Sequence, residues 1–166
     1  MRRMLMLFAA VALLALSLAP VVQAQGSQGG APFDAGFTLE IEANDPDFPG
    51  ACDFPVLIEV SGKGKTIELP NGSFILTSPG LDATVTNTLT GAQETYNVTG
   101  TVRPQPTNAE GNDVTELTGR NLTIDPEAGF VVAIGNFSFA FDAETGELSQ
   151  PLSGEGQLID VCEALA

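Results

Sequence analysis

The stretch DPEAGFVVAIGNFSFAFDAETG, residues 125–146, decides the fold class because it holds one complete strand between two turns. Each turn, over 125–129 and 142–146, begins with Asp and ends with Gly, which is typical of tight connections between antiparallel strands. Between the turns lies an alternation of apolar residues: Phe130, Val132, Ile134, Phe137, Phe139 and Phe141. The alternation changes phase at Gly135, so we expect a β-bulge there that bends the sheet.

The rest of the chain repeats this plan. Segment 87–91 (NTLTG) is a third turn that begins with an Asx residue and ends with Gly, and Asn71-Gly72 reads as a two-residue hairpin turn with positive φ at both positions. No window keeps an apolar period of 3.6 residues long enough for a sizeable helix. Short links build a meander, because parallel strands need long crossovers. We therefore expect residues 33–166 to form one all-β domain of about eight antiparallel strands.

Two cysteines, Cys52 and Cys162, are the only ones in the chain. In an exported protein this number predicts one disulfide. Cys52 begins the first clear core strand and Cys162 ends the last, so the bond would join the two edges of the sheet. In a meander that junction is the seam of a closed β-barrel. The alternative is a two-sheet β-sandwich held by the same bond.

The N-terminal 24 residues have the features of a secretory signal peptide. Arg2 and Arg3 precede an apolar run over 4–18, and Val22-Gln23-Ala24 supplies small residues for cleavage after Ala24. The run is shorter than a membrane span needs, so we expect no membrane anchor. Residues 25–32 (QGSQGGAP) have nothing to bury and are interpreted as a flexible leader. The predicted location is extracellular.

Composition narrows the function further. The chain has 21 acidic and 6 basic residues, a formal charge of −15, and no His. This charge disfavours nucleic acid as a partner, and the lack of His excludes Ser-His-Asp and Cys-His catalysis and His-ligated metals. We expect a monomer without a cofactor.

Two short motifs resemble ligand sites but are interpreted as turns. The acidic turn at 44–47 (NDPD) is interpreted as solvated and not as a calcium loop. Segment 62–66 (GKGKT) is interpreted as a hairpin turn and not as a phosphate loop.

Aromatic residues on inward-facing positions form the candidate ligand site. If the barrel is hollow, an apolar calyx for one small apolar ligand would be lined by Tyr96, Phe130, Phe137, Phe139 and Phe141. If it is filled, the same residues are core. Outward threonines at 84, 86, 88, 95, 99 and 101 form a second candidate surface, although Thr is also a common strand residue.

Several stretches are similar to a group of small exported β-proteins of actinomycetes. The similarity covers most of the chain after residue 24 and rests on segments 51–56, 65–70, 77–80, 135–137 and 148–162. It implies export and no particular activity.

From the sequence we expect a secreted, non-catalytic protein that acts as an extracellular binding or envelope-associated module. Two alternatives stay open: a carrier of a small apolar ligand inside the barrel, and an enzyme that uses paired carboxylates or shapes a reactive substrate as a barrel-type cyclase does. No pair among the 21 carboxylates can be chosen from the sequence, so no catalytic residue is assigned.

Overall fold

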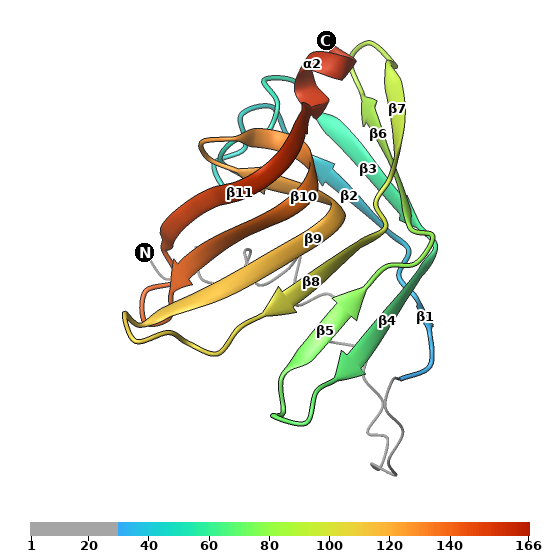
Figure 1. Ribbon diagram of the computed structural model, residues 1–166. Coiled ribbons are helices and arrows are strands. Elements are labelled where there is room, and N and C mark those ends of the chain that lie inside the picture. The colour runs from blue at the N-terminus through green and yellow to red at the C-terminus, as the bar shows by residue number, and fades with distance from the viewer. Residues whose placement is uncertain (1–29) are drawn as a thin grey trace.

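The computed structural model describes residues 30–166 (Figure 1). The expected signal peptide, 1–24, and most of the expected leader, 25–32, lie outside the described residues. Antiparallel strands make up almost all of the regular structure, followed by the short helix α2 (Val161–Leu165). The prediction of an all-β antiparallel fold is confirmed. Within 30–166 no helix is long and apolar enough to cross a membrane.

The larger of two sheets has seven strands in the order β1-β4-β5-β8-β9-β10-β11. They are β1 (Phe33–Asp34), β4 (Lys63–Glu68), β5 (Phe74–Thr77), β8 (Gly100–Pro104), β9 (Asn112–Asp125), β10 (Gly129–Asp142) and β11 (Leu148–Asp160). The last three are 13 or 14 residues long and curve strongly (Figure 1).

The smaller sheet has four strands in the order β2-β3-β6-β7. They are β2 (Phe37–Ile41), β3 (Val56–Ser61), β6 (Asp82–Asn87) and β7 (Gln93–Asn97). Four chain segments therefore serve both sheets: β1 and β2, β3 and β4, β5 and β6, and β7 and β8 are successive parts of bent segments. The bends raise the number of strands to eleven, where about eight were expected.

Gly62 shows how one of these bends is made. It alone separates β3 from β4, and its φ is 123°. A Cβ at this position would collide with the backbone of Gly80 and Leu81 in the next bent segment, so only glycine fits. The interpretation of 62–66 as a hairpin turn was wrong, because β3 and β4 do not pair with each other.

The two sheets do not close into a barrel, so the expectation of a closed barrel was wrong. The outer strands β1 and β11 of the larger sheet do not pair. Instead, the β9–β10 hairpin curls back until Asp125 Oδ2 accepts a hydrogen bond from the Leu152 amide of β11, at 2.7 Å. The carboxylate thus accepts from a backbone N–H group of the edge strand β11. A strand that closed a barrel would have to pair with that same edge. The disulfide is consequently not a barrel seam.

The expected bulge at Gly135 is also absent. Gly135 lies directly opposite Gly119 of β9 and Gly156 of β11, and pairing continues without a shift on both sides. Its φ of 142° belongs to glycine, and a Cβ would collide with the Glu155 carbonyl. The register shifts between β10 and β11 lie further along, beside Ala140. The alternation keeps its phase through Gly135. Phe130, Val132 and Ile134 pack in a cluster between the two sheets, whereas Ala133, Phe137 and Phe139 pack in a second cluster.

The interior consists of two apolar clusters. The first lies between the two sheets and includes Val56, Ile58, Val85, Phe130 and Val132, with Tyr96 and Ile134 packed against it. The second includes Leu117, Ala133 and Phe137, with Val102, Phe139 and Leu152 packed against it. Residues 130–133 are all buried because both faces of β10 are covered there.

The three Asx turns are confirmed. The Oδ1 atoms of Asn87, Asp125 and Asp142 each accept hydrogen bonds from the amides two and three residues ahead. These hydrogen bonds stabilise the ionised carboxylate of Asp142 and hold its pKa below the ordinary value. The bond from the Thr145 amide has the largest effect, and the bond from the Glu144 amide adds to it. The 71–72 turn differs from expectation. Positive φ was expected at both Asn71 and Gly72. Among the described residues Gly72 has it and Asn71 does not.

Candidate functional site

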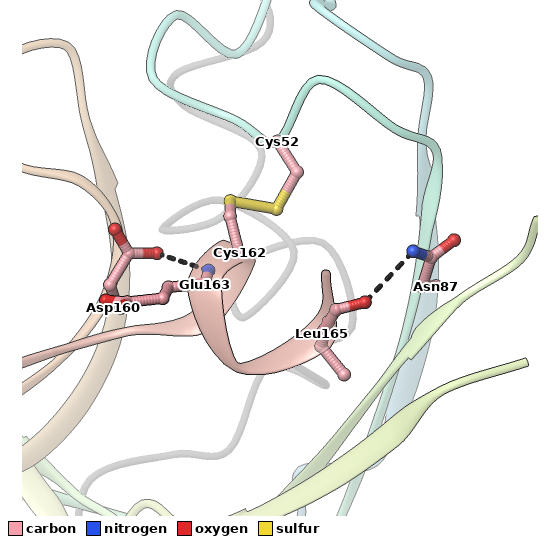
Figure 2. The surroundings of a disulfide bond; sticks show 6 residues. All are labelled: Cys52, Asn87, Asp160, Cys162, Glu163 and Leu165. Atoms are coloured by element: carbon pink, nitrogen blue, oxygen red, sulfur yellow. Dashed lines mark hydrogen bonds between the residues drawn. A yellow bond between two sulfur atoms is a disulfide. The ribbon is translucent and has the colours of Figure 1, made fainter. Parts of the chain in front are cut away.

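The predicted disulfide between Cys52 and Cys162 is present, with 5.4 Å between the Cα atoms (Figure 2). Cys52 lies in the loop before β3, and Cys162 lies in α2. The bond therefore fastens the C-terminal helix to the loop that enters the smaller sheet, across 110 residues of chain.

Helix α2 closes one end of the space between the sheets (Figure 1). Val161 and Leu165 are fully buried in the first cluster. Asp160 caps the helix by accepting a hydrogen bond from the Glu163 amide at 2.9 Å. Asn87, only 2% exposed, donates from Nδ2 to the Leu165 carbonyl at 3.1 Å (Figure 2). One buried amide thus shapes the 87–91 turn with its oxygen and holds α2 with its nitrogen.

The five candidate ligand-lining residues are not brought together. Tyr96 and Phe130 belong to the cluster between the sheets. Phe137 and Phe139 belong to the second cluster, and Phe141 meets Phe139 edge to face with ring centroids 5.6 Å apart. The aromatic side chains pack as core in two places.

Tyr96 has one property that the other four lack. Its hydroxyl is buried without a hydrogen-bond partner among the described residues. Burial first, and then the charges of Glu94 and Asp160, raise the pKa of Tyr96 above its ordinary value. A buried polar atom without a partner costs stability, and such atoms are uncommon.

The surface of residues 30–166 has two open depressions. The first, about 390 Å³, lies beside the disulfide and is lined by Gly50, Ala51, Cys52, Asp53, Phe54, Gly129, Phe130, Asp160, Cys162, Glu163 and Ala166. The second, about 340 Å³, is lined by Asn71, Gly72, Ser73, Phe74, Pro104, Gln105 and Pro106. Of the five candidate aromatics, only Phe130 touches either one, and it is almost fully buried.

The second depression was missed by sequence reasoning. Phe74, on β5, is 40% exposed and forms part of the wall of this depression. The available signal was the pair Pro104 and Pro106 directly after a strand pattern, since proline ends a ladder of hydrogen bonds. The position of Phe74 beside these prolines depends on the pairing of β5 with β8, which the sequence does not reveal.

The acidic 44–47 turn is held by hydrogen bonds that involve its own backbone amides. Asp45 Oδ1 accepts a hydrogen bond from the Asp47 amide at 2.9 Å, and the Asn44 amide donates to the Cys52 carbonyl. Across residues 30–166 no group of three or more His, Cys, Asp or Glu residues is placed to hold a metal ion.

Outward threonines pair across strands in the smaller sheet. Thr84 and Thr95 lie opposite each other with their hydroxyls 2.9 Å apart, and Gln93 donates to Thr86 at 3.0 Å. Asn97 donates to Asp82 in the same way. The side-chain polar groups on this face therefore bond to one another across the strands, which supports a structural role for the threonines.

Comparison with known proteins gives no relative: no protein-family model matches the chain, and searches of curated proteins and of solved structures found no match. The similarity to exported actinomycete proteins stays a prediction.

Proposed function

We propose that this chain is an exported, non-catalytic binding protein that acts outside the cell, in the medium or at the envelope. The observation that carries the proposal is the filled interior. Phe130 and Phe137 are buried in separate clusters, and α2 closes the end between the sheets. A partner would therefore be met on the surface, where both depressions lie.

Export is supported by the disulfide as well as by the N-terminal sequence. Disulfides persist in oxidising compartments and are rare in the cytosol of most organisms. Cys52 is only 2% exposed, and its bond anchors a helix that completes the main core. We propose that the chain is cleaved after Ala24 and folds after translocation.

The carrier alternative has one observation in its favour, the buried Tyr96 hydroxyl. A ligand between the sheets could supply the partner that this hydroxyl lacks among the described residues. The packing around it argues for a filled core, because Tyr96 lies against a cluster in which Ala83, Val85 and Val132 are fully buried.

Two measurements on the protein collected from the medium test these proposals. The denatured mass should match residues 25–166 less two hydrogens, and the native mass should equal it. Extra mass in the native spectrum alone would favour the carrier. The protein should also sediment with the envelope fraction of the exporting cells. If neither that fraction nor the medium provides a partner that changes its sedimentation, the binding function is wrong.

A further inference from the structure

We propose that the second depression, between the ends of β5 and β8, binds one neutral sugar unit of an extracellular polysaccharide. This inference rests on the proposed binding function and names its ligand. The site is surrounded by residues 71–74 and 104–106.

The depression exists because two neighbouring strands separate. β5 and β8 pair at only two positions, Leu76 with Val102 and Thr77 with Thr101. Pro104 has no amide hydrogen, so it cannot donate to a continued ladder. Phe74, two residues before Leu76, pairs with Glu68 of β4. An open space is left between Phe74 and the two prolines.

The lining chemistry suits a neutral, hydroxyl-rich ligand. All seven lining residues are uncharged, in a chain that carries 21 carboxylates, whereas the depression beside the disulfide has Asp53, Asp160 and Glu163 on its wall. Phe74 and the prolines offer apolar surface to the C–H face of a sugar ring. A volume of about 340 Å³ is at the small end for a ligand site, which favours a single ring over a large molecule.

Two amide side chains are held ready to bond with hydroxyls. Asn71 Oδ1 accepts from the Ser73 amide at 3.2 Å and from the Ser73 hydroxyl at 2.7 Å, which leaves its Nδ2 to donate. Gln105 Nε2 donates to Glu116 at 2.7 Å, which leaves its Oε1 to accept. A sugar hydroxyl both donates and accepts, so one fixed donor and one fixed acceptor match it. Because these side chains are already oriented, binding would order few groups.

The test is NMR titration of the exported protein, disulfide intact, with neutral cello-, malto- and chito-oligosaccharides. At least one should shift the backbone amides of residues 71–74 and 105. Phe74→Ala should weaken that binding about tenfold, because it removes the aromatic contact. Phe37→Ala is the matched control, since Phe37 is also 40% exposed but lies on β2, and it should leave the affinity unchanged.

Gln105→Ala is a second variant of the same site, and it keeps the proposal testable if Phe74→Ala does not fold. Gln105→Ala removes one half-buried side-chain amide with its hydrogen bond to Glu116, and it should weaken binding of the same oligosaccharide. The site proposal is overturned if no neutral oligosaccharide shifts these amides at millimolar concentration, or if both variants bind as the parent does. It is also overturned if a proline-rich hexapeptide shifts them and the sugars do not. If Phe74→Ala still sediments with the envelope like the parent, the proposed function stands and this site is wrong. If neither the envelope fraction nor the medium provides a partner that changes the sedimentation of the parent, the proposed function fails.

Discussion

Asp125 and Leu152 are 27 residues apart in the chain, yet the Asp125 carboxylate accepts a hydrogen bond from the Leu152 amide at 2.7 Å. The same carboxylate shapes its own turn through Oδ1 and is only 4% exposed. It therefore forms a hairpin and holds the tip of that hairpin against the edge strand. A side chain of this kind lets a long sheet curl without closing into a barrel.

Asp125→Asn should destabilise the protein by about 1–3 kcal/mol, because an NH₂ group would face the part-buried Leu152 amide. Urea unfolding measures the loss. Asp142→Asn is the matched control, since Asp142 uses only Oδ1 in the same kind of turn, and asparagine keeps that oxygen. Equal losses for the two variants would show that the contact with Leu152 contributes nothing.

Gly135→Ala should cost about 2–5 kcal/mol, because it combines an unfavourable φ with a collision against the Glu155 carbonyl. Gly91→Ala has a positive φ of 79° but nothing within 4 Å of its new Cβ, so it should cost only about 1–2 kcal/mol. Thermal unfolding of both variants separates the two effects. The role given to Gly135 is wrong if its variant loses no more stability than Gly91→Ala.

Replacing both cysteines, Cys52→Ser with Cys162→Ser, should lower the free energy of unfolding by about 4.7 kcal/mol, the loop-entropy value for a closed loop of about 100 residues. The bond here closes a separation of 110 residues. Reduction of the parent protein should have a similar effect. An unchanged melting temperature would mean that α2 stays docked through Asn87 and its buried apolar residues alone.

Tyr96 should make stability fall in alkaline solution. Its pKa is raised in the folded protein, so its contribution is intact below the unfolded pKa of about 10 and is lost as the pH rises through the folded value. Tyr96 is the only tyrosine, so the absorbance of tyrosinate reports it alone. Tyr96→Phe should flatten the fall in stability above pH 10. The burial of the Tyr96 hydroxyl is contradicted if Tyr96 titrates like a free tyrosine.

The sequence predicted the local features well because they depend on neighbouring residues. Alternation over Cys52, Phe54, Val56, Ile58 and Val60 predicted one buried face, and all five residues are buried. The Asx turns followed from Asp or Asn with Gly four positions later. The disulfide followed from counting cysteines in a chain with export features.

The division into two sheets could not be predicted, because its cause lies between distant segments. Gly62 looks like any turn residue until the backbone of Gly80 and Leu81 is seen against it. Likewise, Phe74 reads as an ordinary strand residue until β5 is placed beside β8 and Pro104 separates them. Alternation reports which face a residue takes, but not which strand it meets.

The four bent segments also determine how the molecule can come apart. β3 and β4 form one segment, divided only by Gly62, although they belong to different sheets. We therefore expect that unfolding of the smaller sheet would also disturb the strands of the larger one. Two layers that share their strands should behave as a single cooperative unit of unfolding, and neither can be excised or exchanged as a module. Any insertion or deletion in a shared segment must be accommodated by both layers at once.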